Sequence, residues 1–306
     1  MALHEQSEAF LREIASLPAS HTIEPQELRK LVAGTAISDA FELACTEDRW
    51  VGGPHGDLLL RIYRPLKEGD LPVLVYYHGG GFVLCDVKKY DPLCRMLAAV
   101  TGCAVVSVDY RLAPEHRFPI AVEEAHFAVQ WVAEHCVSLG FDPASLFVAG
   151  DSAGGNLAAV VAQLARNEGS PRIAGQILIC PMADFGGDYE SMHLFASGYF
   201  LNRDVLNYFT RHYLREEADR TNPLASPMNG EFTGLPPALI VTAEYDPLRD
   251  EGETYGRRLA EAGGIVTHKR YLGMIHGFYS MTDLFDDAHS VYKQIYAFLQ
   301  SILART

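Results

Sequence analysis

Short apolar runs alternate with longer segments of helical period along this chain, and no other feature constrains its fold as strongly. The apolar runs, rich in Val, Ile, Leu and Tyr, occupy residues 58–63, 73–77, 104–108, 146–149, 176–180, 238–243 and 266–271. Apolar residues recur at three- and four-residue steps in residues 120–139, 156–167, 250–262 and 288–304. Strand-sized runs that alternate with amphipathic helices predict an α/β fold, in which helices flank a mostly parallel central sheet.

Two regions, residues 1–45 and 185–222, fall outside this alternation and are candidates for a helical cap. The second region carries a large apolar surface, made of Leu194, Phe195, Tyr199, Phe200, Leu201, Tyr208, Phe209 and Tyr213. These side chains form either the core of the cap helices or the wall of a pocket, and both roles stay open. The predicted division is 1–45 for the N-terminal part of the cap, 46–184 and 223–306 for the α/β core, and 185–222 for a cap insertion.

Charge and cysteine content exclude several classes of function. The chain has 39 acidic and 25 basic residues and a formal charge of −14, so nucleic acid and anionic membranes are poor partners. No apolar stretch approaches the roughly 20 residues of a membrane-spanning helix, and the first residues lack the pattern of a secretory signal. The six cysteines form no Cys-x-x-Cys pair, which predicts reduced core residues in a cytoplasmic protein.

The motif Gly150-Asp151-Ser152-Ala153-Gly154-Gly155 lies between the apolar run 146–149 and the helical segment that begins near residue 156. A sharp turn from strand to helix holds a serine in a strained backbone, and glycines two positions before and after it avoid a clash. The pattern Gly-x-Ser-x-Gly alone can arise by chance or serve only packing, but its position between a strand and a helix favours a nucleophile elbow. Ser152 is therefore the candidate nucleophile.

Three consecutive glycines follow the apolar run 73–77, in the motif His78-Gly79-Gly80-Gly81-Phe82. Their bare backbone N–H groups can approach a developing oxyanion closely. The alternative use of such a loop is phosphate binding, but the chain contains neither a P-loop nor a dinucleotide-binding pattern. We therefore predict no nucleotide cofactor, and we expect His78 to hold the loop through hydrogen bonds.

An acid and a histidine follow the last two predicted strands. Asp246 comes after the run 238–243 and is favoured because Pro247 fixes the chain directly after it, whereas His276 comes after the run 266–271. The competing carboxylates are Glu244, Asp250 and Glu251. Functional groups of open α/β sheets gather beyond the carboxyl ends of the strands, so we expect both residues to lie near Ser152. The order Ser, Asp, His is typical of α/β-hydrolases.

These motifs together resemble the hormone-sensitive-lipase-like (bacterial family IV) carboxylesterases of the α/β-hydrolase superfamily, in the subgroup with the nucleophile motif Gly-Asp-Ser-Ala-Gly-Gly. The resemblance rests on residues 78–82, 109–115, 150–155, 246–250 and 276–278, in the order of the family, and it covers most of the chain. One departure is Cys180-Pro181, where the family often has Tyr-Pro. We assign no function to this departure from sequence.

The resemblance implies a role for each candidate residue. Ser152, Asp246 and His276 would form a catalytic triad. The backbone N–H groups of Gly80, Gly81 and Ala153 would form the oxyanion hole. Gly79 is a further candidate for it, because the register of the three glycines could differ by one residue. Phe82, Tyr199, Phe200 and Leu201 would line the substrate pockets, and residues 109–115 would brace the loops. No metal site is expected, since the chain lacks His-Glu-x-x-His or another cluster with ligand spacing.

The expected function is that of a carboxylesterase, which hydrolyses uncharged short- to medium-chain esters through an acyl-enzyme. No cofactor is implied. The partner is a small-molecule ester, and a homodimer is an open alternative to a monomer. A hormone receptor on the same scaffold would lack the catalytic histidine, so His276 argues against it. Amidase or peptidase activity from the same triad stays open.

Overall fold

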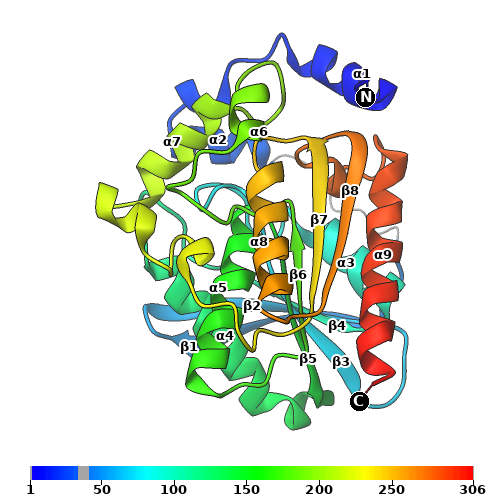
Figure 1. Cartoon of the computed structure of the whole chain (residues 1–306). Helices are drawn as coiled ribbons and strands as arrows, with labels where there is room; N and C mark the ends of the chain where they lie inside the picture. The colour runs from blue at the N-terminus through cyan, green and yellow to red at the C-terminus, as the bar shows by residue number, and fades with distance from the viewer. Residues whose placement is uncertain (1, 34–40, 306) are drawn as a thin grey trace.

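Among residues 2–33 and 41–305, which the computed structural model describes, eight strands form one sheet (Figure 1). The strands are β1 (Cys45–Gly53), β2 (Gly56–Arg64), β3 (Leu71–Tyr77), β4 (Ala104–Val108), β5 (Phe141–Asp151), β6 (Gly175–Ile179), β7 (Ala238–Tyr245) and β8 (Val266–Ile275). Their spatial order is β1-β2-β4-β3-β5-β6-β7-β8. β2 runs antiparallel to β1 and β4, and all other paired strands of this sheet are parallel, so the expected mostly parallel sheet is confirmed.

Helices cover both faces of the sheet. One layer contains α4 (Ile120–His135), α5 (Ala153–Glu168) and α8 (Arg249–Glu261), and the other contains α3 (Asp91–Thr101) and α9 (Asp286–Leu303). Successive residues of β3 point to opposite layers: Val73 and Val75 pack in the core beneath α4 and α5, whereas Leu74 and Tyr76 pack beneath α3 and α9. A strand buried on both faces needs a continuous apolar run, which is why these strands are readable in the sequence.

Four further helices gather at one end of the molecule, at the top of Figure 1. They are α1 (Glu5–Ile14), α2 (Pro25–Val32), α6 (Glu190–Leu194) and α7 (Arg203–Tyr213), and they come from the two regions that fall outside the strand–helix alternation. The two regions touch: the Tyr208 hydroxyl donates to the Ile23 carbonyl at 3.0 Å, and the rings of Phe10 and Phe200 lie 5.5 Å apart. Within the predicted range 1–45, residues 1 and 34–40 lie outside the described residues.

Short 3₁₀ turns complete the described structure, at Ser20–Thr22, Val137–Leu139, Glu217–Thr221, Pro227–Asn229 and Phe278–Ser280. No helix in the described ranges is long and apolar enough to cross a membrane. No disulfide joins the six cysteines, which all lie in the described part of the chain. The expectation that they are core residues is wrong for Cys45, because this residue is exposed on the edge strand β1.

Candidate active site

Ser152 lies at the junction of β5 and α5 in a strained backbone conformation. Its φ of 53° and ψ of −116° are unusual for a residue with a side chain. The flanking glycines are sterically required: a Cβ on Gly150 would collide with the carbonyl of Gly154, and a Cβ on Gly154 would collide with the carbonyl of Tyr77. The turn therefore has the geometry of a nucleophile elbow, as the glycine spacing predicts.

His276 lies between Ser152 and Asp246. Its Nε2 is 3.2 Å from the Ser152 Oγ, and its Nδ1 is 2.7 Å from the Asp246 Oδ2. The carboxylate can only accept, so Nδ1 carries the proton and Nε2 is left free to accept one. The other oxygen of Asp246 accepts from the Leu248 N–H at 2.9 Å, and the Asp246 side chain is buried. This arrangement of hydroxyl, imidazole and carboxylate can transfer the serine proton to the ring.

The competing carboxylates have other partners. The Glu244 side chain accepts from the Gly273 N–H at 2.7 Å. Asp250 accepts from the Ser191 N–H, and Glu251 accepts from the Ala183 N–H, both at 2.8 Å. These contacts attach the end of β7 and the start of α8 to neighbouring segments of the chain. Asp246 is therefore the carboxylate of this group that the structure brings to His276.

The backbone N–H groups of the glycine loop and of the residue after Ser152 differ in their hydrogen-bond partners. The N–H groups of Gly80, Gly81 and Ala153 donate no hydrogen bond to another residue in the described ranges. Gly80 and Gly81 have positive φ angles of 112° and 63°, which turn the loop at this point. Gly79 departs from the expectation, because its N–H already donates to the Asp151 Oδ1 at 3.1 Å. This N–H therefore joins the glycine loop to the turn at Ser152 and is not free to bind an oxyanion.

Asp151 is a buried carboxylate that sequence reasoning missed. It accepts from the hydroxyls of Tyr76 at 2.6 Å, Tyr90 at 2.7 Å and Tyr279 at 2.6 Å, in addition to the Gly79 N–H. Burial, and next the charge of Asp151, raise the pKa of all three tyrosines well above the usual value, so the hydroxyls stay donors. The sequence does contain a signal for this role, because Asp151 is an acidic residue inside the nucleophile motif, directly after an apolar strand.

His78 holds the glycine loop through a hydrogen bond, as expected. Its Nδ1 donates to the Gly79 carbonyl at 2.7 Å, and its ring stacks on Tyr110 with 4.3 Å between centroids. The Tyr110 hydroxyl donates to the His78 carbonyl at 2.6 Å, and the Ala113 N–H donates to the Phe82 carbonyl at 2.9 Å. Burial lowers the pKa of His78, which favours the neutral ring. Residues 109–115 therefore brace this loop.

The expected pocket residues of the cap insertion lie close to the acid and histidine loops. Tyr199 packs against Tyr245, the neighbour of the acid, with 5.6 Å between ring centroids. The Phe200 ring, 44% exposed, is 3.3 Å from the position that a Cβ on Gly277 would take, next to His276. Leu201 is buried in the hydrophobic core on the α4 and α5 side of the sheet. Tyr199 and Phe200 are thus placed at the edge of the site.

Two aromatic residues near the glycine loop are Phe82, which is expected from sequence to line a pocket, and Phe209, for which core and pocket wall are both open from sequence. Phe82 is 1% exposed, and its ring stacks on Tyr213 with 3.8 Å between centroids, so this ring lies in the interior. Phe209 of α7 lies directly against Gly81, because a Cβ on that glycine would collide with its ring. The aromatic residues of 185–222 predicted a pocket wall as one of two roles, but the sequence did not distinguish Phe209 from the others.

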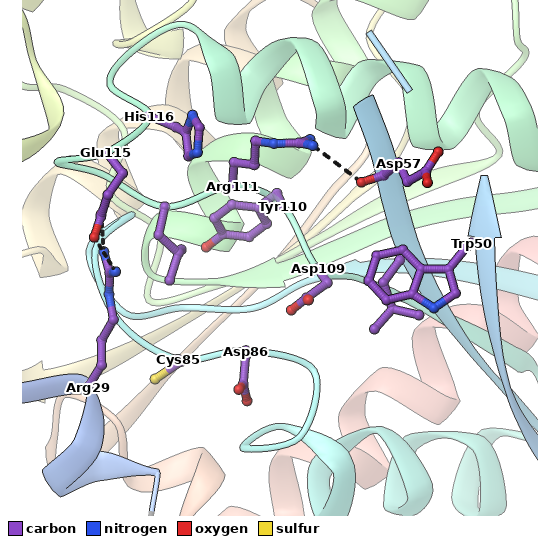
Figure 2. Close-up of a pocket in the computed structure, with 12 residues that line it drawn as sticks. Arg29, Trp50, Asp57, Cys85, Asp86, Asp109, Tyr110, Arg111, Glu115 and His116 are labelled. Carbon is purple, nitrogen blue, oxygen red and sulfur yellow. Dashed lines mark hydrogen bonds and ion pairs between the residues drawn. The ribbon is translucent and has the colours of Figure 1, made fainter. Parts of the chain in front are cut away.

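A separate cavity of about 440 Å³ is lined by residues of α2, β1 and β2 and of the segments 85–86 and 109–116 (Figure 2). Its lining includes Trp50, Cys85 and Asp109, and no triad residue lines it. Arg29 of α2 reaches across it to Glu115 at 2.8 Å and also donates to the Ala113 carbonyl at 2.6 Å. The cavity therefore lies between α2 and residues 109–116, and Arg29 bridges it.

Comparisons with known proteins agree with this geometry. The family model of the alpha/beta hydrolase fold matches residues 74–280. The carboxylic ester hydrolase LipN of Mycobacterium tuberculosis is 43% identical over 266 residues, which are 84% of this chain and 70% of that protein. The ethyl acetate hydrolase of Pseudomonas putida is 37% identical over 283 residues, 88% of this chain and 87% of that protein.

A solved structure gives the same result. The esterase of Pyrobaculum calidifontis superposes with a TM-score of 0.93 at 39% identity, over 98% of this chain and 99% of that one. Sequence identity at this level over nearly the whole length, together with the same fold, shows family membership. The chain belongs to the hormone-sensitive-lipase-like family of α/β-hydrolases and is a carboxylesterase.

Proposed function

We propose that Ser152, His276 and Asp246 are the catalytic triad of this carboxylesterase. His276 takes the Ser152 proton at Nε2 while the Ser152 Oγ attacks the ester carbonyl, and Asp246 orients and stabilises the imidazolium. His276 then protonates the leaving alcohol, and in the second half it activates the water that releases the acyl-enzyme. The single observation that carries the proposal is the continuous chain of contacts, 3.2 Å from serine to histidine and 2.7 Å from histidine to aspartate.

The oxyanion hole is assigned to the N–H groups of Gly80, Gly81 and Ala153. Their freedom from other partners in the described ranges supports this assignment. Ala153 is the first residue of α5, so the positive end of the helix dipole adds to its N–H. The loss of one such donor typically reduces kcat about a hundred- to thousand-fold.

The substrates are uncharged esters of short to medium chain length. Tyr199, Phe200 and Phe209 present aromatic surface at the edge of the site, which favours an apolar acyl or alcohol group. Phe209 lies against Gly81 and leaves little room for a long chain there. A relative named for ethyl acetate hydrolysis supports small esters. Residues 1–45 and 185–222 act as the cap over this pocket.

We also place the chain in the subgroup with the Gly-Asp-Ser-Ala-Gly-Gly motif, and the contacts of Asp151 support a structural reason for its aspartate. The enzyme would work in the cytoplasm on dissolved small-molecule esters, since four of its thiols are buried and unpaired. A homodimer stays a prediction, which size-exclusion chromatography with light scattering would test.

Substitution of the nucleophile tests the mechanism. The Ser152→Ala variant should fold with an unchanged circular dichroism spectrum and lose hydrolysis of a chromogenic short-chain ester, because it removes the hydroxyl that lies 3.2 Å from the His276 Nε2. A fluorophosphonate probe should label the native protein and not the variant. Substantial turnover by the variant would rule out Ser152. A series of acyl chains from acetate to palmitate tests the substrate class, and a maximum at the longest chains would contradict it.

A further inference from the structure

Cys180 lies beside the proposed triad, although no step of the mechanism uses it. It directly follows β6, its N–H donates to the Val241 carbonyl at 2.7 Å, and its side chain is buried. The ligand atoms of Cys180, Asp246 and His276 all lie within 4.8 Å of one another. Within the described ranges, this is the group of three His, Cys or acidic side chains that is spaced to hold a metal ion.

The three side chains supply the ligand types that Zn²⁺ prefers. Typical bonds are about 2.3 Å to a thiolate, 2.0–2.1 Å to an imidazole and 2.0–2.2 Å to a carboxylate, in a tetrahedral arrangement. Such bonds place the nitrogen and oxygen ligands about 3.3 Å apart, so the 2.7 Å contact between Asp246 and His276 must widen by only about 0.6 Å. A dication also neutralises the carboxylate and thiolate charges, which would be unfavourable if buried together alone.

We propose that Cys180, Asp246 and His276 form an inhibitory site for Zn²⁺. This inference rests on the proposed role of His276. Binding forms bonds from zinc to the Cys180 Sγ, an Asp246 oxygen and the His276 Nδ1, and water takes the fourth position. The thiol proton leaves to solvent, the Nδ1 proton moves to Nε2, and no electron is transferred. A protonated Nε2 cannot accept the Ser152 proton, so ester hydrolysis stops.

The site does not follow from the triad alone. Asp246 and His276 offer only two ligands, and two ligands bind zinc weakly. The third ligand comes from Cys180, at a position where the family often has tyrosine. Thiolate sulfur is a preferred zinc ligand and a phenol oxygen is not, so a tyrosine in that position would be a poor ligand. Sensitivity to zinc at this site is therefore a property of the cysteine in this chain.

Metal binding can be measured without using activity. Co²⁺ serves as the probe, because a cobalt–thiolate bond gives an intense charge-transfer band in the near ultraviolet. Cys45 is an exposed thiol that could bind cobalt, so the spectra are recorded on Cys45→Ser protein. We expect a band that saturates at one Co²⁺ per chain, disappears on addition of Zn²⁺, and is absent after Cys180→Ser or His276→Ala is added. No band in the Cys45→Ser protein, or a band that survives both changes, would overturn the proposal.

Inhibition is measured against each variant's own activity. Zn²⁺ should inhibit the native enzyme reversibly, and EDTA should restore it. Cys180→Ser should need at least about tenfold more zinc for half inhibition, because loss of even an outer contact of a zinc site weakens binding about 10- to 100-fold. Cys85→Ser is the matched control, since Cys85 faces the separate cavity, and it should keep full sensitivity. Equal sensitivity of Cys180→Ser and native enzyme would refute the site.

The two proposals can fail separately. Turnover by Ser152→Ala protein would remove the proposed mechanism but would leave the cobalt spectrum unchanged. Loss of the cobalt band, in turn, has no bearing on fluorophosphonate labelling of Ser152. If Cys180→Ser does not fold, His276→Ala decides the spectral result, because it keeps the thiol and removes the imidazole ligand.

Discussion

Asp151 illustrates how one residue can set the geometry of a site without touching the substrate. Its carboxylate accepts three tyrosine hydroxyls and the Gly79 N–H, and these donors come from β3, the start of α3, the turn after His276 and the glycine loop. A carboxylate has about four positions for donors, and here all are used. The charge therefore stays buried in a fully satisfied network, and the network joins the three loops of the site.

We expect Asp151→Asn to reduce kcat by at least about tenfold, because hydrogen bonds to a charged group contribute about 1.5–3 kcal/mol and an amide cannot accept all four donors. The KM should change less, since the pocket walls of Tyr199 and Phe200 do not contact Asp151. Steady-state kinetics with a short-chain ester measure both constants. Tyr279→Phe, which removes a single donor, should show a smaller decrease in kcat. An unchanged kcat in Asp151→Asn would contradict this role.

At the scale of elements, helix α2 contacts residues 109–115 through hydrogen bonds, such as that from Arg29 to the Ala113 carbonyl, and through an ion pair that depends on pH. Arg29 contacts Glu115 at 2.8 Å and lowers the pKa of this carboxyl to about 2. A lowered pKa stabilises the folded state above the unfolded value of about 4.3, and this contribution is lost as the pH falls toward the folded value. Glu115 is partly exposed, so the contribution is modest.

The variant Glu115→Gln isolates this effect. Its melting temperature should lie below that of the native protein at neutral pH. The difference should shrink as the pH falls from about 4 toward 2, because the carboxyl of the unfolded chain is protonated first and that of the folded chain only near its pKa of about 2. Thermal denaturation at several pH values measures the difference. Glu68→Gln, in the loop before β3, is the control and should show no such dependence. A difference that stays constant with pH would exclude the ion pair as its cause.

The elements that sequence predicts and those that it misses differ in how they are buried. The central strands are covered on both faces and are continuous apolar runs, so their pattern is readable. β1 is an edge strand with an exposed face and polar residues such as Glu47 and Asp48. The alternation of apolar and polar residues along it is therefore weak. α3 has 11 residues and is the shortest helix of the two layers, so its apolar period extends over few turns. The prediction of the triad needed only strand order, whereas Asp151 and Phe209 act through contacts that only the folded chain creates.

At the scale of the whole molecule, the N-terminal helix is joined to the loop that carries the histidine. The Ser7 hydroxyl and the His4 N–H both donate to the Gly273 carbonyl, at 2.9 Å and 3.1 Å, at the end of β8. The Phe10 ring lies 5.5 Å from Phe200 and 6.0 Å from Phe285. The first helix thus contacts residues 185–222, the loop that carries His276 and the approach to α9, so the start of the chain lies against the edge of the candidate site.

We expect Phe10→Ala to weaken substrate binding more than it weakens the fold. Without the ring, Phe200 loses its support at the edge of the site, so the KM for a short-chain ester should rise several-fold. The kcat should change little, because Ser152, His276 and Asp246 keep their contacts. The melting temperature should fall only slightly, since Phe10 is partly exposed and lies outside the two helical layers. Leu17→Ala, at a residue 63% exposed, is the control and should leave the KM unchanged. A large loss of melting temperature with an unchanged KM would instead make α1 a structural brace with no part in substrate binding.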